Sequence, residues 1–147
     1  MQIEAKRANI EAGRSMRLEL PDITKRLERA LDGLPQLDVV VGVATGGTVL
    51  AGLAAHKLGL PLRLLHINYR AGDNAPQREA PEVLAGVTLR GRQRVLLVDD
   101  VSVTGATLRA ATALLSAHEV TTLTLKGRAD ATLYPEVTRC ILLPWRD

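Results

Sequence analysis

Residues 95–108 read VLLVDDVSVTGATL, and this stretch decides the predicted fold. Its first four residues are aliphatic, which is typical of a strand that is buried on both faces of a parallel sheet. The run ends in two adjacent carboxylates, Asp99 and Asp100, and a short segment of small and hydroxyl-bearing residues follows. The stretch therefore predicts a strand over 94–99, a polar loop, and a helix over 105–117.

The rest of the chain continues this alternation of strand and helix. Asp22 is expected to cap the first helix, and Gly33 is expected to end it. Residues 70–86 have no period and predict a long loop, either a binding lid or a solvated surface hairpin. The alternation indicates an α/β fold, a single domain with a mostly parallel central sheet flanked by helices. The other predicted elements are helices over 22–34 and 47–58, and strands over 38–43, 62–69, 119–126 and 139–143.

The length and composition of the chain restrict the class of protein to which it can belong. The 147 residues suffice for one domain, which we expect to span 1–147, with an arm and helix over 1–37 and a core over 38–126. The single cysteine, Cys140, cannot form an internal disulfide and is expected in the core, which favours a cytoplasmic protein. No apolar stretch is long enough to span a membrane. The net charge of +3 comes without interleaved aromatic residues, so nucleic acid is not an expected partner.

The loop that follows the aspartate pair has the chemistry of an anion site. Backbone N–H groups at a helix N-terminus bind phosphate well, and the hydroxyls of Thr104 and Thr107 add donors. Two carboxylates repel such a phosphate unless a ribose diol or a hydrated Mg²⁺ lies between them. We therefore expect a ligand with phosphate at one end and sugar hydroxyls or a metal at the other.

A second loop, ATGG at 44–47, follows the predicted strand over 38–43. It is either a second anion site made of backbone amides or a simple tight turn. No lysine follows its glycines as a P-loop requires. In an open parallel sheet, ligands bind beyond the carboxyl ends of the strands, where both loops are expected.

Together the two loops resemble the type I phosphoribosyltransferase family over residues 37–145. VLLVDDVSVTGATL resembles that family's signature for phosphoribosyl pyrophosphate (PRPP), and VVVGVATGG resembles its pyrophosphate loop, with a cis peptide bond expected between Ala44 and Thr45. The resemblance implies Mg²⁺-dependent exchange of pyrophosphate for a nitrogenous base at the anomeric carbon. It also implies that Asp99 and Asp100 are catalytic, hold the ribose hydroxyls or the metal's waters, and face an oxocarbenium-like transition state. The implied PRPP-binding residues are Ala44, Thr45, Gly46, Gly47, Ser102, Val103, Thr104, Gly105, Ala106 and Thr107.

The end of the chain bears on which base is used, and residues 127–147 are expected to form a C-terminal segment on the side of the base. Lys126 ends a predicted strand, and ILLPW at 141–145 is similar to the closing strand of the small 6-oxopurine enzymes, so the resemblance implies a purine with Lys126 as a base contact. It further implies a mobile lid over 68–84, with Tyr69 and Arg70, and a homodimer.

Three residues depart from that 6-oxopurine pattern. Val103 stands where those enzymes carry an aspartate, Cys140 stands where they often carry a stacking aromatic residue, and Thr45 stands where many relatives carry a basic residue. The alternative is therefore a non-catalytic protein of the same fold that senses PRPP or binds a nucleotide.

Overall fold

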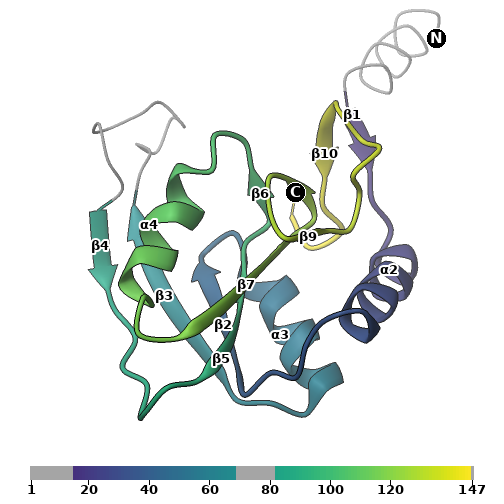
Figure 1. The fold of residues 1–147 in the computed structure, drawn as a ribbon. Coiled ribbons are helices and arrows are strands. Elements are labelled where there is room, and N and C mark those ends of the chain that lie inside the picture. The colour runs from purple at the N-terminus through teal and green to yellow at the C-terminus, as the bar shows by residue number, and fades with distance from the viewer. Residues whose placement is uncertain (1–14, 69–81, 147) are drawn as a thin grey trace, which may run out of the picture.

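The computed structural model describes residues 15–68 and 82–146, and it contains a six-stranded central sheet (Figure 1). The strand order is β4-β3-β2-β5-β7-β9, and all pairs are parallel except the antiparallel pair of β4 with β3. The six strands are β2 (Val39–Ala44), β3 (Leu62–Asn68), β4 (Glu82–Ala85), β5 (Arg94–Val98), β7 (Glu119–Thr124) and β9 (Ala131–Thr132). The α/β fold with a mostly parallel sheet is thus confirmed.

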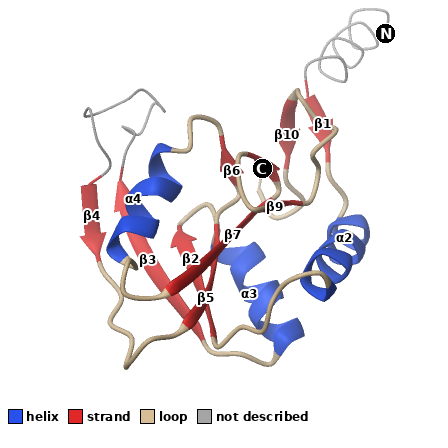
Figure 2. Ribbon diagram, viewed as in Figure 1, coloured by secondary structure: helices blue, strands red, loops and turns tan. Residues whose placement is uncertain are grey.

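Helices cover both faces of this sheet (Figure 2). On one face, α2 (Leu20–Asp32) and α3 (Thr48–Leu58) pack on a core that includes Val40, Leu96 and Leu123. On the other face, α4 (Ala106–Leu114) packs on a core that includes Val41 and Leu97. Side chains alternate along β2 and β5 between the two cores, which is why these strands read as continuous apolar runs. No helix in the described part of the chain is long and apolar enough to cross a membrane.

The first helix begins earlier than predicted, and the predicted cap is wrong. Glu19 is the N-cap residue and makes no side-chain capping bond, while Pro21 occupies the first turn, where its missing N–H costs nothing. Asp22 lies inside the helix, and its carboxylate instead accepts a 2.7 Å hydrogen bond from the Tyr134 hydroxyl. Gly33 does end the helix, as predicted.

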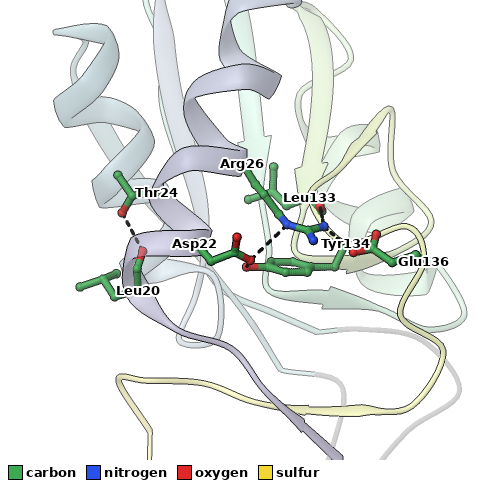
Figure 3. Close-up of polar contacts among 7 residues, drawn as sticks. All are labelled: Leu20, Asp22, Thr24, Arg26, Leu133, Tyr134 and Glu136. Carbon is green, nitrogen blue, oxygen red and sulfur yellow. Dashed lines mark hydrogen bonds and ion pairs between the residues drawn. The ribbon is translucent and has the colours of Figure 1, made fainter.

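Asp22 belongs to a polar cluster that ties α2 to the segment after β9 (Figure 3). Arg26 lies over the Tyr134 ring at 4.0 Å from its centroid and donates to the Leu133 carbonyl at 2.9 Å. Its guanidinium also contacts Asp22 at 3.2 Å and Glu136 at 2.5 Å. One arginine therefore joins the first described helix to the C-terminal part of the chain.

The predicted strand over 139–143 forms, but outside the central sheet. It is β10 (Cys140–Leu142), and it pairs in parallel with β1 (Ser15–Arg17) in a separate two-stranded sheet. Cys140 is exposed there, so its expected place in the core is wrong. Side chains alternate along a strand, so Cys140 and Leu142 share the face that is open to water, while Ile141 packs against the core.

Two further boundaries differ from the sequence-based expectation. The end of the predicted loop over 70–86 is strand β4, and residues 69–81, which include Tyr69 and Arg70, lie outside the described residues. The predicted strand over 119–126 is divided, because β8 (Lys126–Gly127) leaves the sheet to pair with β6 (Val101–Ser102).

Candidate functional site

The two loops singled out in the sequence meet at one edge of the sheet. They follow β2 and β5, which are adjacent and parallel, with Gly42 in register with Val98. A Cβ atom on Gly47 would lie 2.5 Å from the Val98 carbonyl oxygen and 2.8 Å from the Asp99 Cα atom. Side chains do not tolerate such distances from backbone atoms, so glycine at position 47 lets the loops pack backbone against backbone.

Gly46 brings the 44–47 loop against the aspartate pair itself. A Cβ atom there would lie 2.8 Å from each carboxylate oxygen of Asp100. The peptide bond between Ala44 and Thr45 is cis, as predicted, and the Thr45 side chain is exposed. The backbone of this loop and the carboxylate of Asp100 therefore face the same small volume.

The two carboxylates occupy different environments. Asp99 is buried, with 7% of its surface exposed, and its Oδ1 accepts a 2.8 Å bond from the Asp100 N–H. Asp100 accepts a 2.7 Å bond from the Val101 N–H, and its Oδ2 lies 3.8 Å from the Arg146 guanidinium. Burial, with the negative charge of Asp100 adding to it, raises the pKa of Asp99 well above its ordinary value. Asp99 thus holds a proton more readily than an ordinary aspartate does.

The loop after the pair turns sharply into α4. Gly105 adopts the left-handed conformation, with φ of 83°, directly before the helix. The Thr104 hydroxyl accepts a 3.2 Å bond from the Ala106 N–H, and Arg109 holds the Thr104 carbonyl at 3.0 Å. A pocket of about 80 Å³, a size suited to one phosphate group, is lined by Asp99 and residues 101–108. An anion in this pocket would lie at the N-terminus of α4, where helix N–H groups stabilise negative charge.

Ser102 and Val103 lie in this same loop and differ in their exposure to solvent. Ser102 is buried, and its hydroxyl has no hydrogen-bond partner among the described residues, although it lines the pocket. Val103 is 73% exposed at the rim. A buried hydroxyl without a partner is costly, and a bound ligand could satisfy it.

Lys126 lies next to the backbone of Asp100. Its backbone N–H is 3.3 Å from the Asp100 carbonyl oxygen, and its ammonium group donates to the Arg139 carbonyl at 2.6 Å. The adjacent Gly127 has a φ of 103°, and a Cβ atom there would lie 1.9 Å from the Ser102 carbonyl oxygen. The structure thus brings the predicted base contact close to the loop of the acid pair, with its side chain bound to the segment that precedes β10.

Two residues at the site have no counterpart in the sequence-based prediction. Thr124 is fully buried, its hydroxyl has no partner in the described parts of the chain, and it follows Leu123, which is in register with Val98. It therefore lies beside Asp99, on the same face of the sheet. Alternation along β7 could have indicated an inward-facing Thr124, whereas nothing local in the sequence indicates that Arg146 contacts Asp100.

The acid pair fits a hard divalent cation. Mg²⁺ prefers oxygen ligands, keeps several waters and often binds through one or two carboxylates together with substrate phosphates. Asp99 and Asp100 supply such carboxylates beside two loops suited to phosphate. In residues 15–68 and 82–146 no cluster of three or more His, Cys, Asp or Glu side chains forms, so any cation here would need ligands from water or substrate.

Comparisons with known proteins agree with this geometry. The model of the phosphoribosyl transferase domain family matches residues 9–129. The transcriptional regulator GfcR of Methanoculleus marisnigri is 36% identical over 93 residues, which is 63% of this chain and 43% of that protein. The orotate phosphoribosyltransferase of Saccharolobus solfataricus is 32% identical over 94 residues, which is 64% of this chain and 44% of that protein. This chain thus spans less than half the length of each of these two relatives.

A solved structure matches over nearly the whole chain. The purine phosphoribosyltransferase of Pyrococcus horikoshii Ot3 superposes with a TM-score of 0.74 at 25% identity, covering 90% of this chain and 95% of that one. At this coverage the similarity extends over most of the fold.

Proposed function

The chain belongs to the phosphoribosyl transferase domain family, and from that premise we propose that it transfers phosphoribose from PRPP to a nitrogenous base. In this reaction the bond from C1 of ribose to pyrophosphate oxygen breaks, a bond from C1 to a base nitrogen forms, and that nitrogen loses its proton. The observation that carries the proposal is the contact of Gly46 with Asp100, because it joins an acid pair to two loops suited to phosphate. PRPP has phosphate on both sides of its ribose diol.

Different residues of the site would bind different parts of PRPP. Residues 102–107 would hold the 5′-phosphate in the pocket at the start of α4, and residues 44–47 would hold the pyrophosphate. Asp99 and Asp100 would hold the ribose hydroxyls, and would hold Mg²⁺ mostly through those hydroxyls or through water. Bound Mg²⁺ would neutralise charge on the pyrophosphate, which is the leaving group. The fixed carboxylates would favour positive charge that develops on the ribose ring in the transition state.

A purine is the base that we propose. The matched structure from Pyrococcus horikoshii is a purine enzyme that covers this chain almost completely. Lys126, close to the acid pair, is the proposed base contact, and it would have to leave the Arg139 carbonyl in order to reach a base oxygen. Tyr69 and Arg70 are proposed as part of a lid over the reacting atoms.

A second function is a non-catalytic protein that binds PRPP or a nucleotide. Val103 presents an exposed apolar side chain at the rim of the site, and Cys140 and Thr45 are also exposed. Val103 and Cys140 offer a base no acidic partner and no ring to stack on, and Thr45 offers a pyrophosphate no charge. One of the relatives is a transcriptional regulator, which favours this alternative for the present chain.

A panel of bases separates the two functions. The protein would be incubated with PRPP, Mg²⁺ and one of hypoxanthine, guanine, xanthine, adenine, uracil or orotate, and nucleotide and pyrophosphate would be measured. Stoichiometric formation of both from a purine supports the proposed enzyme. If no base gives nucleotide while PRPP still stabilises the folded protein against heat, the protein binds PRPP without catalysis.

Three properties of the whole chain complete the proposal. We propose that residues 1–147 form one domain, that two copies associate as a homodimer, and that the protein works in the cytoplasm on PRPP and a nucleobase, without nucleic acid or membrane as a partner. Light scattering after size-exclusion chromatography tests the dimer, and a mass equal to the 15.8 kDa of one chain would contradict it.

A further inference from the structure

The C-terminal turn brings a cation to the acid pair. Leu143 is buried and anchors the turn, and the Arg146 N–H closes it with a 3.2 Å bond to the Leu143 carbonyl. The Arg146 guanidinium then reaches to 3.8 Å from Oδ2 of Asp100. In Figure 1 the yellow end of the chain returns to the region of β6, which follows the acid pair.

Arg146 and Gly46 approach the same carboxylate. Gly46 packs so closely that a Cβ atom would lie 2.8 Å from both oxygens of Asp100, while Arg146 contacts one of these oxygens. The backbone of the 44–47 loop, the Asp100 carboxylate and the Arg146 guanidinium therefore border one volume. An anionic group held by that loop would lie within reach of the guanidinium.

The charges of the side chains at the site favour such a cation. The side chains of residues 44–47 and 102–107 are uncharged, and the two carboxylates oppose a ligand that carries several negative charges. Arg109 approaches the second loop, but its guanidinium donates to the Thr104 carbonyl. Among residues 15–68 and 82–146, Arg146 is the cation that forms an ion pair with the carboxylate beside the 44–47 loop.

The contact between Arg146 and Asp100 is weak enough that the guanidinium can bind a second group as well. Arg146 is 57% exposed and its guanidinium is 3.8 Å away, and ion pairs of this kind contribute little to stability. A guanidinium has five N–H donors, so it can contact a carboxylate and a phosphate together, and it binds phosphate with strong charge-assisted bonds.

We infer that Arg146 is a binding residue for the pyrophosphate end of the ligand, and this inference rests on the proposed function. It supplies from the C-terminal turn the positive charge that Thr45 does not supply from the loop. The 5′-phosphate lies in the other pocket, at the start of α4, so Arg146 distinguishes the two phosphate ends of the ligand.

Calorimetric titration of the full chain tests this inference with two separate probes, pyrophosphate with Mg²⁺ and ribose 5-phosphate. Arg146→Gln should weaken pyrophosphate binding by about tenfold or more, as expected for the loss of a charge-assisted hydrogen bond. Ribose 5-phosphate should bind within about twofold of wild type. Arg146→Lys should give an intermediate affinity for pyrophosphate, because it restores the charge without the planar fork.

Arg90→Gln is the matched control. Arg90 is an exposed arginine in the turn before β5, at the opposite end of that strand from the acid pair, so this variant loses the same charge away from the site. Unfolding midpoints in urea should be equal for all variants, because both side chains are exposed.

Two results would overturn the inference. Unchanged or tighter pyrophosphate binding by Arg146→Gln would show that the guanidinium only neutralises Asp100 or competes with the ligand. Wild-type protein that binds neither probe would refute the proposed function, and the role of Arg146 with it. The affinity of the wild type thus distinguishes failure of the inference alone from failure of the proposed function.

Discussion

At the scale of single residues, Asp99 and Asp100 have different surroundings because they are neighbours at the end of a strand. Successive side chains at the end of a strand point to opposite faces. Asp99 therefore turns toward the face that α4 covers, where burial raises its pKa, and Asp100 turns toward Gly46 and the 44–47 loop. Asp100 is the carboxylate that lies against the 44–47 loop, so a change at Asp100 is the more direct test of ligand binding.

Asp100→Asn should abolish Mg²⁺-dependent PRPP binding or turnover while the protein stays folded. The amide keeps the shape of the side chain but loses its charge, and removal of one electrostatic partner at such sites costs about 100-fold or more. The measurement is turnover, or PRPP affinity by calorimetry, alongside a urea unfolding curve. Asp32→Asn, at an exposed position at the end of α2, is the control. Undiminished binding by Asp100→Asn would show that the acid pair does not hold the ligand.

The sequence predicts some residues of the site better than others. The 44–47 and 102–107 loops can be found because strand ends, glycines and hydroxyls are local signals. The structure brings the first loop to Asp100, and the second loop lines a pocket together with Asp99. Arg146 cannot be found in this way, because its contact with Asp100 joins two distant parts of the sequence through the packing of the turn. The prediction for Cys140 is wrong because an apolar neighbourhood does not reveal that its strand lies at the surface.

At the scale of elements, the two loops work together only because β2 and β5 end at the same level. Gly47 is the residue at which the loops pack, whereas a Cβ atom on Gly52, inside α3, would meet no neighbouring atom within 4 Å. The two glycines can therefore be compared directly. Glycine is required at position 47 because the loops pack there, whereas no neighbouring atom requires it at position 52.

Gly47→Ala should lower the free energy of unfolding by about 1–3 kcal/mol, as overpacking does, because its Cβ meets the backbone of Val98 and Asp99. Gly52→Ala should raise it by about 0.5–1 kcal/mol, because alanine favours a helix interior. Urea unfolding of both variants checks the pair. A Gly47→Ala protein as stable as wild type would mean that the loops separate freely.

At the other end of β2 and β5, where the two strands start, the carboxylate of Asp38 joins them. Arg94 donates to Asp38 through its backbone N–H at 2.8 Å and through two guanidinium nitrogens, both at 3.0 Å. These bonds from Arg94, first those from its side chain, lower the pKa of Asp38 to about 2. A carboxyl whose pKa is lower when folded stabilises the fold above its ordinary pKa, near 4, and loses that contribution as the pH falls toward 2.

Asp38→Asn should therefore be less stable than wild type at pH 7, and the difference should shrink between pH 4 and pH 2. Urea midpoints at pH 7, 5, 3 and 2 measure this. Asp32→Asn should follow the wild-type curve. A gap between Asp38→Asn and wild type that is as wide at pH 2 as at pH 7 would contradict the assignment.

The elements of five residues or more are predictable from the sequence, whereas of the shorter ones only β10 is predicted as a strand. β2, β3, β5, α3 and α4 lie within a few residues of their predicted bounds because each shows a clear apolar run or an apolar period. β1, β6, β8 and β9 have two or three residues, which is too few for any period, and they form only where a neighbouring strand supplies hydrogen bonds. The same absence of local signal explains why the sequence does not show that β10 lies outside the central sheet.

At the scale of the whole molecule, ligand binding should stabilise the fold by linkage. Both loops and the acid pair belong to the packed sheet, so a ligand that binds them binds the folded state. At 100 times its dissociation constant, PRPP with Mg²⁺ should raise the free energy of unfolding by about 2.7 kcal/mol.

Thermal unfolding with and without PRPP, Mg²⁺ and EDTA measures this effect. EDTA should remove most of the stabilisation by PRPP and leave the unfolding temperature of the ligand-free protein unchanged. Stabilisation that persists in EDTA would show that the acid pair binds the ribose directly, without the metal.

The C-terminal turn also gives the molecule an internal optical probe. Trp145 is the single tryptophan of the sequence, it packs partly buried against the core that α2 and α3 cover, and it immediately precedes Arg146. A phosphate bound by the guanidinium would change the electric field at the indole, which belongs to the preceding residue. Intrinsic fluorescence would then follow occupancy of the site in real time, without a dye or an introduced label.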